Sequence, residues 1–323
     1  MHPPPDAVHP PPDPTRSPHD PARSPGAVRR ILVVGDLVTD VLVAVPAEIA
    51  IGSDTAASIT VGGGGQAANT AAWLARAGCP VTLIAAVGDD PAGRERVAEL
   101  AAQGVDCAVR AHPGTATGSV VVLTSATERT MITDRGAALR LDPADVTAAV
   151  KAASGAAHLH LSGYPLLHAG SRPAGLAALA AAREGGLTTS VDAASAAPVR
   201  QMGTRTFLDF VRETDLLLVN ADEAEALAGP GSPAEQGAVL AHTARNVIVK
   251  LGGDGALWCG RESAVRLVPG VRVPMIDPTG AGDAFAAGLL SAWVGGGQPR
   301  AALEAGMALG AAAVARIGAR PWR

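Results

Sequence analysis

The 323-residue sequence contains few lysines, cysteines and aromatic residues. Its only lysines, Lys151 and Lys250, precede alanine and leucine, which excludes a phosphate-binding loop that ends in Gly-Lys-Ser or Gly-Lys-Thr. The three cysteines lie far apart, so they fit neither a zinc site nor a disulfide framework and favour a reducing, cytoplasmic location. Aromatic residues make up 2% of the chain, so few side chains are available to stack on a base.

Neither nucleic acid nor a membrane is an expected partner. The net charge of -4 and the absence of a Lys/Arg cluster leave no electrostatic footprint for nucleic acid. The longest uncharged segments, such as residues 284–299, are interrupted by Gly, Gln or Pro and are too short to span a bilayer. With 48% hydrophobic residues the chain can build an ample core, and we expect a soluble protein.

Residues 1–28 differ in composition from the rest of the chain. They contain His-Pro-Pro-Pro-Asp twice and Arg-Ser-Pro twice, which is typical of a low-complexity, disordered tail. This segment has neither the apolar centre of a signal peptide nor the arginine-rich amphipathic pattern of a transit sequence. We therefore predict a dispensable tail over 1–28 and a folded domain over 29–323.

The most informative stretch is Asp-Pro-Thr-Gly-Ala-Gly-Asp at residues 277–283, which runs from a loop into a helix. The first amides of a helix have no intrahelical partners and lie at the positive end of its dipole. The backbone at Gly280, Ala281 and Gly282 could therefore close on a phosphate. A carboxylate beside that phosphate suits a general base, which makes Asp283 the candidate; the alternative is that Asp283 only caps the helix.

Strand-like and helix-like segments alternate along most of the chain, which predicts a mostly parallel sheet covered by helices on both faces. The apolar run 31–34 is typical of a strand buried on both faces. The β-rich segments at about 38–62 and 115–134 are expected to form a separate small sheet that covers a cleft and excludes water. Further strands are expected over 157–161, 187–191, 215–219 and 246–251, and helices over 173–184 and 233–243.

Polar residues near the carboxyl ends of these strands are candidate ligand contacts, because open α/β sheets bind ligands there. Asp36 and Asp40 follow the first strand and could bind sugar hydroxyls; Asp40 is the preferred contact, since Asp36 could be a turn residue. Arg135, just after the second lid segment, could reach an anionic or hydroxylated substrate.

Two further strand ends carry candidate phosphate and metal ligands. Asn220 could bind a phosphate oxygen and Glu223 a magnesium-bound water, because magnesium favours few carboxylates and retained waters. A simple helix cap with solvated acids is the alternative there. Lys250 and the glycines that follow it end another strand, beside the expected position of the 277–283 loop.

A glycine-rich stretch, residues 62–65, precedes an alanine-rich helix that contains Asn69. Glycines allow a ligand to approach the backbone closely. The pattern Gly62-x-Gly64-x-x-Ala67 also satisfies a loose dinucleotide fingerprint, which keeps a dinucleotide-dependent dehydrogenase as a rival interpretation.

These elements, in this order along the chain, resemble the ribokinase-like carbohydrate kinases, also called the PfkB family, over roughly residues 29 to 319. The resemblance implies a Rossmann-like α/β body with a β-lid, ATP as phosphate donor, magnesium, and a sugar-like acceptor phosphorylated on a hydroxymethyl group. It leaves open whether potassium activates the enzyme through the loop at Asp277.

The resemblance also implies residue roles. Asp283 would be the base, and Gly280, Ala281 and Gly282 the anion hole. Val38 and Gln66 depart from the Asn and Lys of ribokinases proper, which argues against ribose itself. The acceptor positions are Asp40, Gly64, Gly65 and Asn69, with Arg135 as a further candidate. The nucleotide and magnesium positions are Asn220, Glu223, Gly252 and Gly255, with Lys250 beside them.

The sequence is compatible with three further interpretations. A nucleoside kinase of the same family would need a flat apolar or aromatic slot for the base. The stretch between Val38 and Thr133 offers only Trp73, on an expected helix, so sugars and sugar acids are favoured. A catalytically silent family member is disfavoured because Asp283 is present. An exposed lid could also pair with a second copy to form a homodimer.

Overall fold

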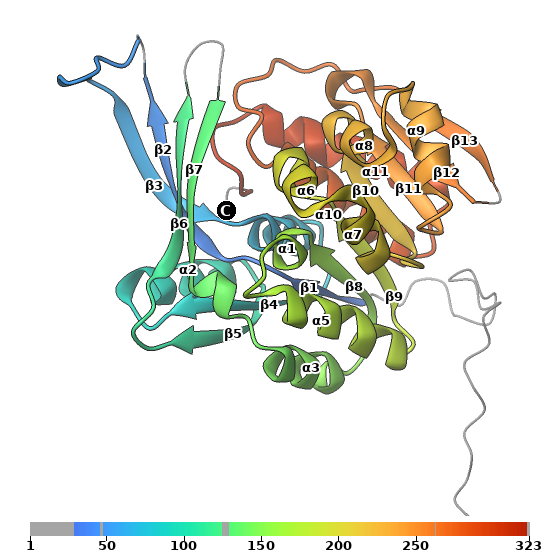
Figure 1. Ribbon diagram of the computed structural model, residues 1–323, viewed down its shortest axis with the longest axis horizontal. Helices are drawn as coiled ribbons and strands as arrows, with labels where there is room; N and C mark the ends of the chain where they lie inside the picture. The colour runs from blue at the N-terminus through green and yellow to red at the C-terminus, as the bar shows by residue number, and fades with distance from the viewer. Residues whose placement is uncertain (1–28, 46–47, 125–128, 262, 322–323) are drawn as a thin grey trace, which may run out of the picture.

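Two β-sheets organise the chain (Figure 1). The computed structural model describes residues 29–45, 48–124, 129–261 and 263–321, so the tail predicted over 1–28 lies outside the described residues. Within these residues the larger sheet has nine strands. Neighbouring strands pair in parallel, except that the last two strands along the chain are each antiparallel to the strand before them. In spatial order these are β13 (Ser263–Val268), β12 (Ala256–Gly260), β11 (Asn246–Lys250), β10 (Leu216–Asn220), β9 (Thr188–Asp192), β8 (Ala156–Ser162), β1 (Arg30–Val34), β4 (Val81–Gly88) and β5 (Asp106–His112).

Helices cover both faces of this sheet, as the sequence predicts. In β1, Ile31 and Val33 join one hydrophobic core cluster while Leu32 and Val34 join another, because successive strand residues point to opposite faces. The first cluster includes residues of α1 (Gln66–Arg76), α2 (Pro91–Ala102), α10 (Ala281–Val294) and α11 (Pro299–Val314). The second includes residues of α3 (Pro143–Ala152), α5 (Arg172–Glu184), α7 (Thr204–Phe210), α8 (Ala221–Ala228) and α9 (Pro233–Leu240).

Local sequence signals set the starts of several helices. Asp90, Asp142 and Ser232 each cap a helix by accepting a backbone N–H, and each precedes a proline at the first helical position. Proline is tolerated there because its missing N–H would have had no intrahelical partner. Within the described residues, no helix combines the length and apolarity needed to cross a bilayer.

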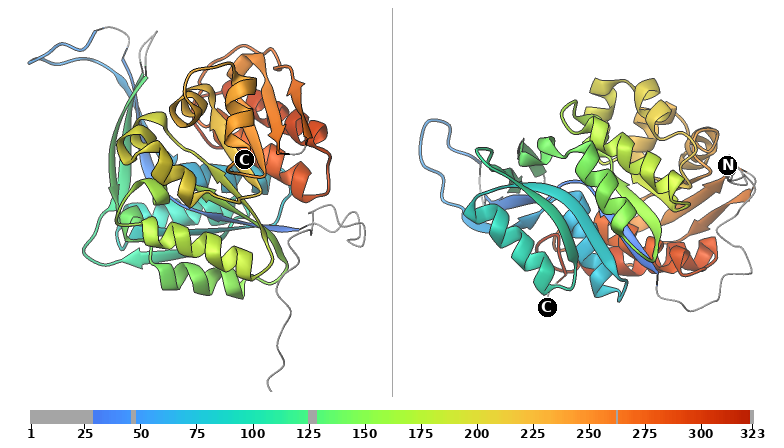
Figure 2. Two further views of the ribbon diagram at one scale, coloured as in Figure 1. Left: turned by 45° about the vertical axis from the view of Figure 1, so that its right-hand side comes forward. Right: turned by 90° about the horizontal axis from the view of Figure 1, so that it is seen from below.

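The smaller sheet forms the lid and projects from one end of the body (Figures 1 and 2). Its order is β3 (Ser58–Gly64), β2 (Val38–Ala44), β6 (Thr117–Thr124) and β7 (Arg129–Gly136). The β2 and β6 strands pair in parallel, and the two outer pairs are antiparallel. The predicted fold class, a mostly parallel sheet between helices with a small β-lid, is confirmed.

The glycine-rich stretch extends a lid strand. Gly62, Gly63 and Gly64 belong to β3, where Gly64 pairs with Val38 of β2. Only Gly65 stands between this strand and α1, with a positive φ of 101°. The loose dinucleotide fingerprint therefore falls on a lid strand and not on a strand-to-helix turn of the large sheet, which removes the basis for the dehydrogenase interpretation.

Candidate active site

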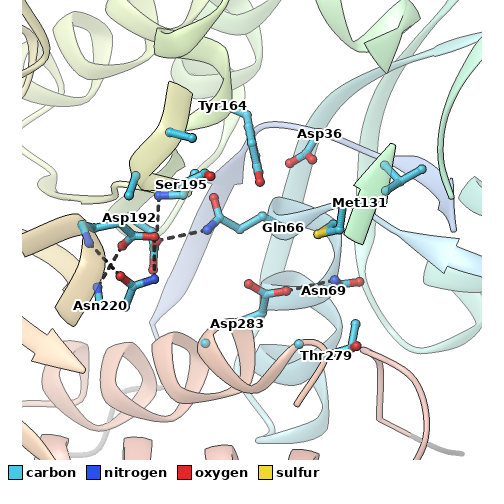
Figure 3. A pocket seen from close by; sticks show the side chains of 18 of the residues that line it. Asp36, Gln66, Asn69, Met131, Tyr164, Asp192, Ser195, Asn220, Thr279 and Asp283 are labelled. Carbon is cyan, nitrogen blue, oxygen red and sulfur yellow. Dashed lines mark hydrogen bonds between the residues drawn. The ribbon is translucent and has the colours of Figure 1, made fainter. Parts of the chain in front are cut away.

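A cavity of about 630 Å³ opens where the lid meets the carboxyl edge of the large sheet (Figure 3). The lid contributes residues of β2, β6 and β7, and the body contributes the ends of β9, β10 and β11 together with the start of α10. This is the edge where open α/β sheets bind ligands. The lining is rich in carboxylates and amides, which suits a hydroxylated or phosphorylated ligand.

The start of α10 forms one wall of the cavity. Gly280 is its N-cap, with a φ of 76° and no side-chain capping bond. A Cβ at this position would lie 2.5 Å from the carbonyl oxygen of Ala319, so the backbone conformation and the space both require glycine. At Gly282 an added Cβ would meet only Lys250 Nζ, at 3.6 Å. The first turn of the helix is therefore open toward the cavity, as anion binding requires.

Asp283 lies in this first turn, and its carboxylate points into the cavity (Figure 3). Asn69 Nδ2 donates a hydrogen bond to Asp283 Oδ2 at 2.9 Å. Burial raises the pKa of Asp283 to about 8, although the Asn69 hydrogen bond opposes the rise; nearby Asp192 adds to it and Lys250 opposes it. The group is thus a much stronger base than an exposed aspartate.

A second set of charges lies next to Asp283, at the ends of β9, β10 and β11. Lys250 Nζ donates to Asp192 Oδ2 at 2.6 Å, and Gln66 Nε2 donates to Asp192 Oδ1 at 3.0 Å. Glu223 accepts from the backbone and side-chain amides of Asn220, both at 2.8 Å, in a reciprocal helix cap. Burial raises the pKa of Glu223 to about 7, while Lys250 opposes the shift and Asp192 adds to it.

The lid side of the cavity carries two more carboxylates. Arg135 Nη1 donates to Asp36 Oδ2 at 3.0 Å, and the guanidinium lies 3.7 Å from the centre of the Tyr164 ring. Burial raises the pKa of Asp40 to about 6, and the charge of Arg320 opposes the shift. Arg135 is paired with Asp36, so the charge at this end of the cavity is partly compensated, while the Nε of Arg135 has no hydrogen-bond partner among the described residues.

A second cavity, of about 500 Å³, lies on the other side of the loop that precedes α10. It shares Lys250, Pro278 and Gly282 with the first. Its other lining residues are mostly glycines and apolar side chains, namely Gly252, Gly253, Gly255, Val271, Val273, Met275, Ala281, Phe285, Met307, Gly310, Ala311 and Val314. The two cavities therefore meet at the helix start that carries Asp283.

The donor set fits magnesium only in the manner of a phosphate-bound ion. Among the described residues there is no group of three His, Cys, Asp or Glu side chains arranged to hold a metal. Magnesium usually keeps several waters and uses one or two carboxylates with phosphate oxygens. Glu223, with Asp192 and Asp222 on the same cavity wall, offers such carboxylates.

Comparison with known proteins identifies the family. Residues 28–322 match the family described as pfkB family carbohydrate kinase. The chain belongs to this family. An ATP-dependent ribose-1-phosphate kinase from Halopiger xanaduensis is 33% identical over 80% of this chain and 82% of that protein. A 2-dehydro-3-deoxygluconokinase from Thermoproteus tenax is 31% identical over 77% of this chain and 78% of its own.

Solved structures of pfkB kinases have the same fold. A proposed ribokinase II from E. coli in complex with ATP and Mg²⁺ superposes with a TM-score of 0.79. It is 26% identical, and the match covers 90% of this chain and 94% of that one. The suspected membership of the ribokinase-like family is thus confirmed over the described domain.

Most of the residues singled out in the sequence lie in the two cavities of this pfkB protein. Gly64 instead lies behind Asp40, and its carbonyl accepts a hydrogen bond from Arg320. The first cavity is lined by Asp40, Gly65, Asn69, Arg135, Asn220, Glu223, Lys250, Gly280, Gly282 and Asp283. Ala281, Gly252 and Gly255 line the second, together with Lys250 and Gly282.

Three residues were missed in the sequence. Asp192 directly follows the predicted strand 187–191, so the strand-end rule that selected Asp36 could have found it. Tyr164 lies just beyond the end of β8 and lines the cavity, which the sequence-based search of the lid for aromatic residues overlooked. Arg320 follows the last helix and no local pattern marks it.

Proposed function

We propose that this pfkB family member is an ATP-dependent phosphotransferase that moves the γ-phosphate to a hydroxymethyl group of a sugar or sugar acid. The observation that carries the proposal is the position of Asp283 in the first cavity, between the carboxylates of the lid side and the glycine-lined start of α10. The start of α10 also borders the second cavity. Transfer between two bound molecules needs an acceptor hydroxyl and a donor phosphate on opposite sides of the transferred group. The two cavities supply such an arrangement.

Asp283 is the proposed general base. An alcohol is a poor nucleophile at neutral pH, so its proton must be accepted as the new O–P bond forms and the bond to the leaving diphosphate breaks. The raised pKa of Asp283, about 8, favours that proton transfer. The amides at the start of α10, next to Gly280 and Gly282, would stabilise the charge spread over the transferred group.

ATP is the proposed donor in the second cavity. The glycines at 252, 253 and 255 leave room for the nucleotide beside apolar side chains of α11. Magnesium, held through a water at Glu223, would neutralise phosphate charge when bound. The related E. coli structure, which is in complex with ATP and Mg²⁺, supports ATP as the donor and magnesium as its metal.

A hydroxyl-rich acceptor is proposed for the first cavity. Asp36, Asp40 and Asn69 offer hydrogen-bonding groups for hydroxyls, and the charge of Arg135 is largely compensated by Asp36. The names of the relatives indicate that they phosphorylate ribose 1-phosphate and 2-dehydro-3-deoxygluconate, which supports a sugar or sugar-acid class.

A nucleoside acceptor is the second candidate, favoured by one observation. Tyr164 lines the acceptor cavity, with Met131, Val38 and Val120 nearby on its wall, and could border a base. However, the guanidinium of Arg135 already covers one face of the Tyr164 ring at 3.7 Å. Sugars therefore remain the favoured class.

We also propose that the lid mediates a homodimer. Ile59, Val61 and Ile132 on its strands are 64%, 61% and 58% exposed, and Val61 and Ile132 lie in one row across the sheet. A contiguous exposed apolar patch is typical of an interaction surface. Replacing Ile59 and Val61 with serine should convert a dimer to a monomer in sedimentation-velocity experiments. A monomeric wild-type protein at micromolar concentration would contradict this assignment.

The function is tested by measuring ADP release from ATP with a panel of sugars, sugar acids and nucleosides. We expect turnover with at least one sugar or sugar acid, and a loss of about 10²–10⁴-fold in Asp283→Asn, as is typical of removing a general base. Turnover that survives in Asp283→Asn would rule out the proposed role. A preference for adenosine over every sugar would favour the nucleoside alternative.

A further inference from the structure

A buried arginine contacts Asn69, the residue that donates a hydrogen bond to the proposed base. Arg320 follows α11, and only 9% of its side chain is exposed. Its Nε donates to Asn69 Oδ1 at 3.1 Å and its Nη2 donates to the carbonyl oxygen of Gly64 at 2.9 Å. Its Nη1 lies 3.4 Å from Glu99 Oε2 on α2. One guanidinium therefore joins the C-terminal segment to α1, α2 and the lid strand β3.

We propose that Arg320 is a positioning residue that fixes the side chain of Asn69 so that Asn69 holds Asp283 in its reactive orientation. This rests on the proposed role of Asp283 and assigns a function to a residue outside the reacting groups.

Asn69 has a donor end and an acceptor end, whereas arginine only donates and an ionised carboxylate only accepts. With Arg320 on one side and Asp283 on the other, only one orientation satisfies both, namely Oδ1 toward Arg320 and Nδ2 toward Asp283. The reversed amide would set two donors against each other on one side and two acceptors on the other. Arg320 therefore fixes the amide of Asn69 in the orientation in which Nδ2 donates to Asp283.

The fixed orientation of Asn69 affects the pKa of Asp283. Burial raises the pKa of the carboxyl group, and the hydrogen bond from Asn69 is the largest influence that opposes the rise. If Asn69 lost its fixed orientation, the carboxylate would lose that stabilisation and its pKa would rise further. Arg320 thus keeps a buried base closer to the pH at which it must work.

The guanidinium of Arg320 also packs against the end of lid strand β3. A Cβ on Gly63 would lie 1.9 Å from Arg320 Nη1, and a Cβ on Gly64 would lie 1.9 Å from Asp40 Oδ1. Successive residues of a strand point to opposite faces, so Arg320 and Asp40 pack on the two faces of β3 where it ends. A side chain at Gly63 or Gly64 would have to displace Arg320 or Asp40. The same stretch of β3 therefore positions both Asp40 and the arginine that contacts Asn69.

The test replaces the donors of Arg320 while keeping its length. Arg320→Met should raise the pKa of Asp283 by roughly 0.5 to 1 unit, the amount expected when a carboxylate loses one hydrogen bond. The pKa is measured from the carboxyl ¹³C shift of Asp283 in protein labelled at aspartate, assigned by its absence in Asp283→Asn. The acidic limb of kcat/KM, measured with whichever acceptor turns over, should move to higher pH by the same amount.

A matched control lies four residues upstream. Arg316→Met also removes one arginine from the C-terminal segment, with loss of its bond to the Ala312 carbonyl and its contact with the Trp73 ring, but it does not touch Asn69. Arg316→Met should leave the titration of Asp283 unchanged. Arg320→Lys, which can still donate to Asn69 Oδ1, should recover part of the shift.

Two results would overturn the proposal. One is an Asp283 titration in Arg320→Met that matches the wild type, whatever happens to activity. The other is an equal shift in Arg316→Met, which would indicate a general loss of structure. If Arg320→Met does not fold, Arg320→Lys and Arg320→Gln are judged by the same titration. If the wild type phosphorylates no acceptor, the proposed function fails, while the titration still decides the role of Arg320.

Discussion

Lys250 Nζ lies 2.6 Å from Asp192 Oδ2, and this pair stands where the two cavities meet. Both side chains are largely buried, with 14% of the lysine and 3% of the aspartate exposed. Burial opposes the charge on Lys250, but Asp192 and Glu223 outweigh it, so the pKa of the ammonium lies above its ordinary value. The ammonium group of Lys250 is therefore held in its charged form beside the start of α10, where we expect phosphate to bind.

Removing this lysine should cost both stability and activity. Lys250→Met leaves Asp192 buried without its partner, and breaking a buried pair in this way costs about 3–5 kcal/mol. We expect a clear fall in the free energy of unfolding, measured by urea titration. The chain offers a matched control in its other lysine, since Lys151 pairs with Glu184 at 3.8 Å on the surface. Equal destabilisation in Lys151→Met and Lys250→Met would contradict this account.

The pH dependence of catalysis should report Asp283. A base must be ionised to accept a proton, and the pKa of Asp283 is raised to about 8. We therefore expect kcat/KM, which reflects the free enzyme, to rise with pH up to about 8 and then level off. Asp40 and Glu223, with pKa values of about 6 and 7, would give limbs at lower pH. If Asp40→Asn moved the limb near pH 8, that limb would belong to a different group.

Asp283 should also lower the stability of the protein at alkaline pH. Its folded-state pKa of about 8 lies above its ordinary value of 3.8, so the folded protein binds the proton more tightly than the unfolded chain. The protonated carboxyl group therefore contributes stability at low pH, and this contribution is lost as the pH rises from 3.8 through about 8. Asp283→Asn cannot ionise, so its Tm should exceed that of the wild type at pH 8 by about 2 °C or more.

The control for this comparison is Asp209→Asn, which removes an exposed carboxylate that pairs with Arg212. It should leave Tm unchanged at pH 8. A lower Tm for Asp283→Asn than for the wild type at pH 8 would mean that the carboxylate is stabilising where it lies, against the direction of its pKa.

The sequence predicted the parts of this site that depend on short-range rules. The helix start at Asp283 followed from glycines and a proline beside a helix-forming run, and Asn220 followed from its place after a strand. Arg320 could not be found this way, because its contacts with Asn69 and Gly64 join residues about 250 positions apart and depend on how the last segment packs. The sequence analysis related the glycines at 62–65 to the approach of a ligand, whereas the missing side chain of Gly63 makes room for Arg320.

Two glycines at the start of α10 should respond differently to alanine. Gly280 has a φ of 76°, and an added Cβ would lie 2.5 Å from the Ala319 carbonyl oxygen, so Gly280→Ala should destabilise the fold by 1 kcal/mol or more, on the order of the cost of a strained backbone position. Gly282→Ala meets only Lys250 Nζ at 3.6 Å and should fold normally. It should still lose activity, because the methyl group intrudes where phosphate approaches the amides. A fully active Gly282→Ala enzyme would argue against this anion site.

The assignment of the second cavity to the nucleotide can be tested by filling that cavity with a larger side chain. Gly310 lines this cavity, and an added Cβ would meet only the Ala281 carbonyl oxygen at 3.5 Å and Phe285 Cβ at 3.6 Å, which are ordinary contacts. Gly310→Met should therefore fold, with Tm unchanged or higher because glycine weakens a helix by roughly 1 kcal/mol relative to ordinary residues. Its side chain would occupy the proposed nucleotide site, so the KM for ATP should rise about 10-fold, a cost of 1.4 kcal/mol in binding. The KM for the acceptor should not change, and Gly310→Ala should have a smaller effect in the same direction. A rise in the acceptor KM instead would mean that the two cavities have been assigned to the wrong substrates.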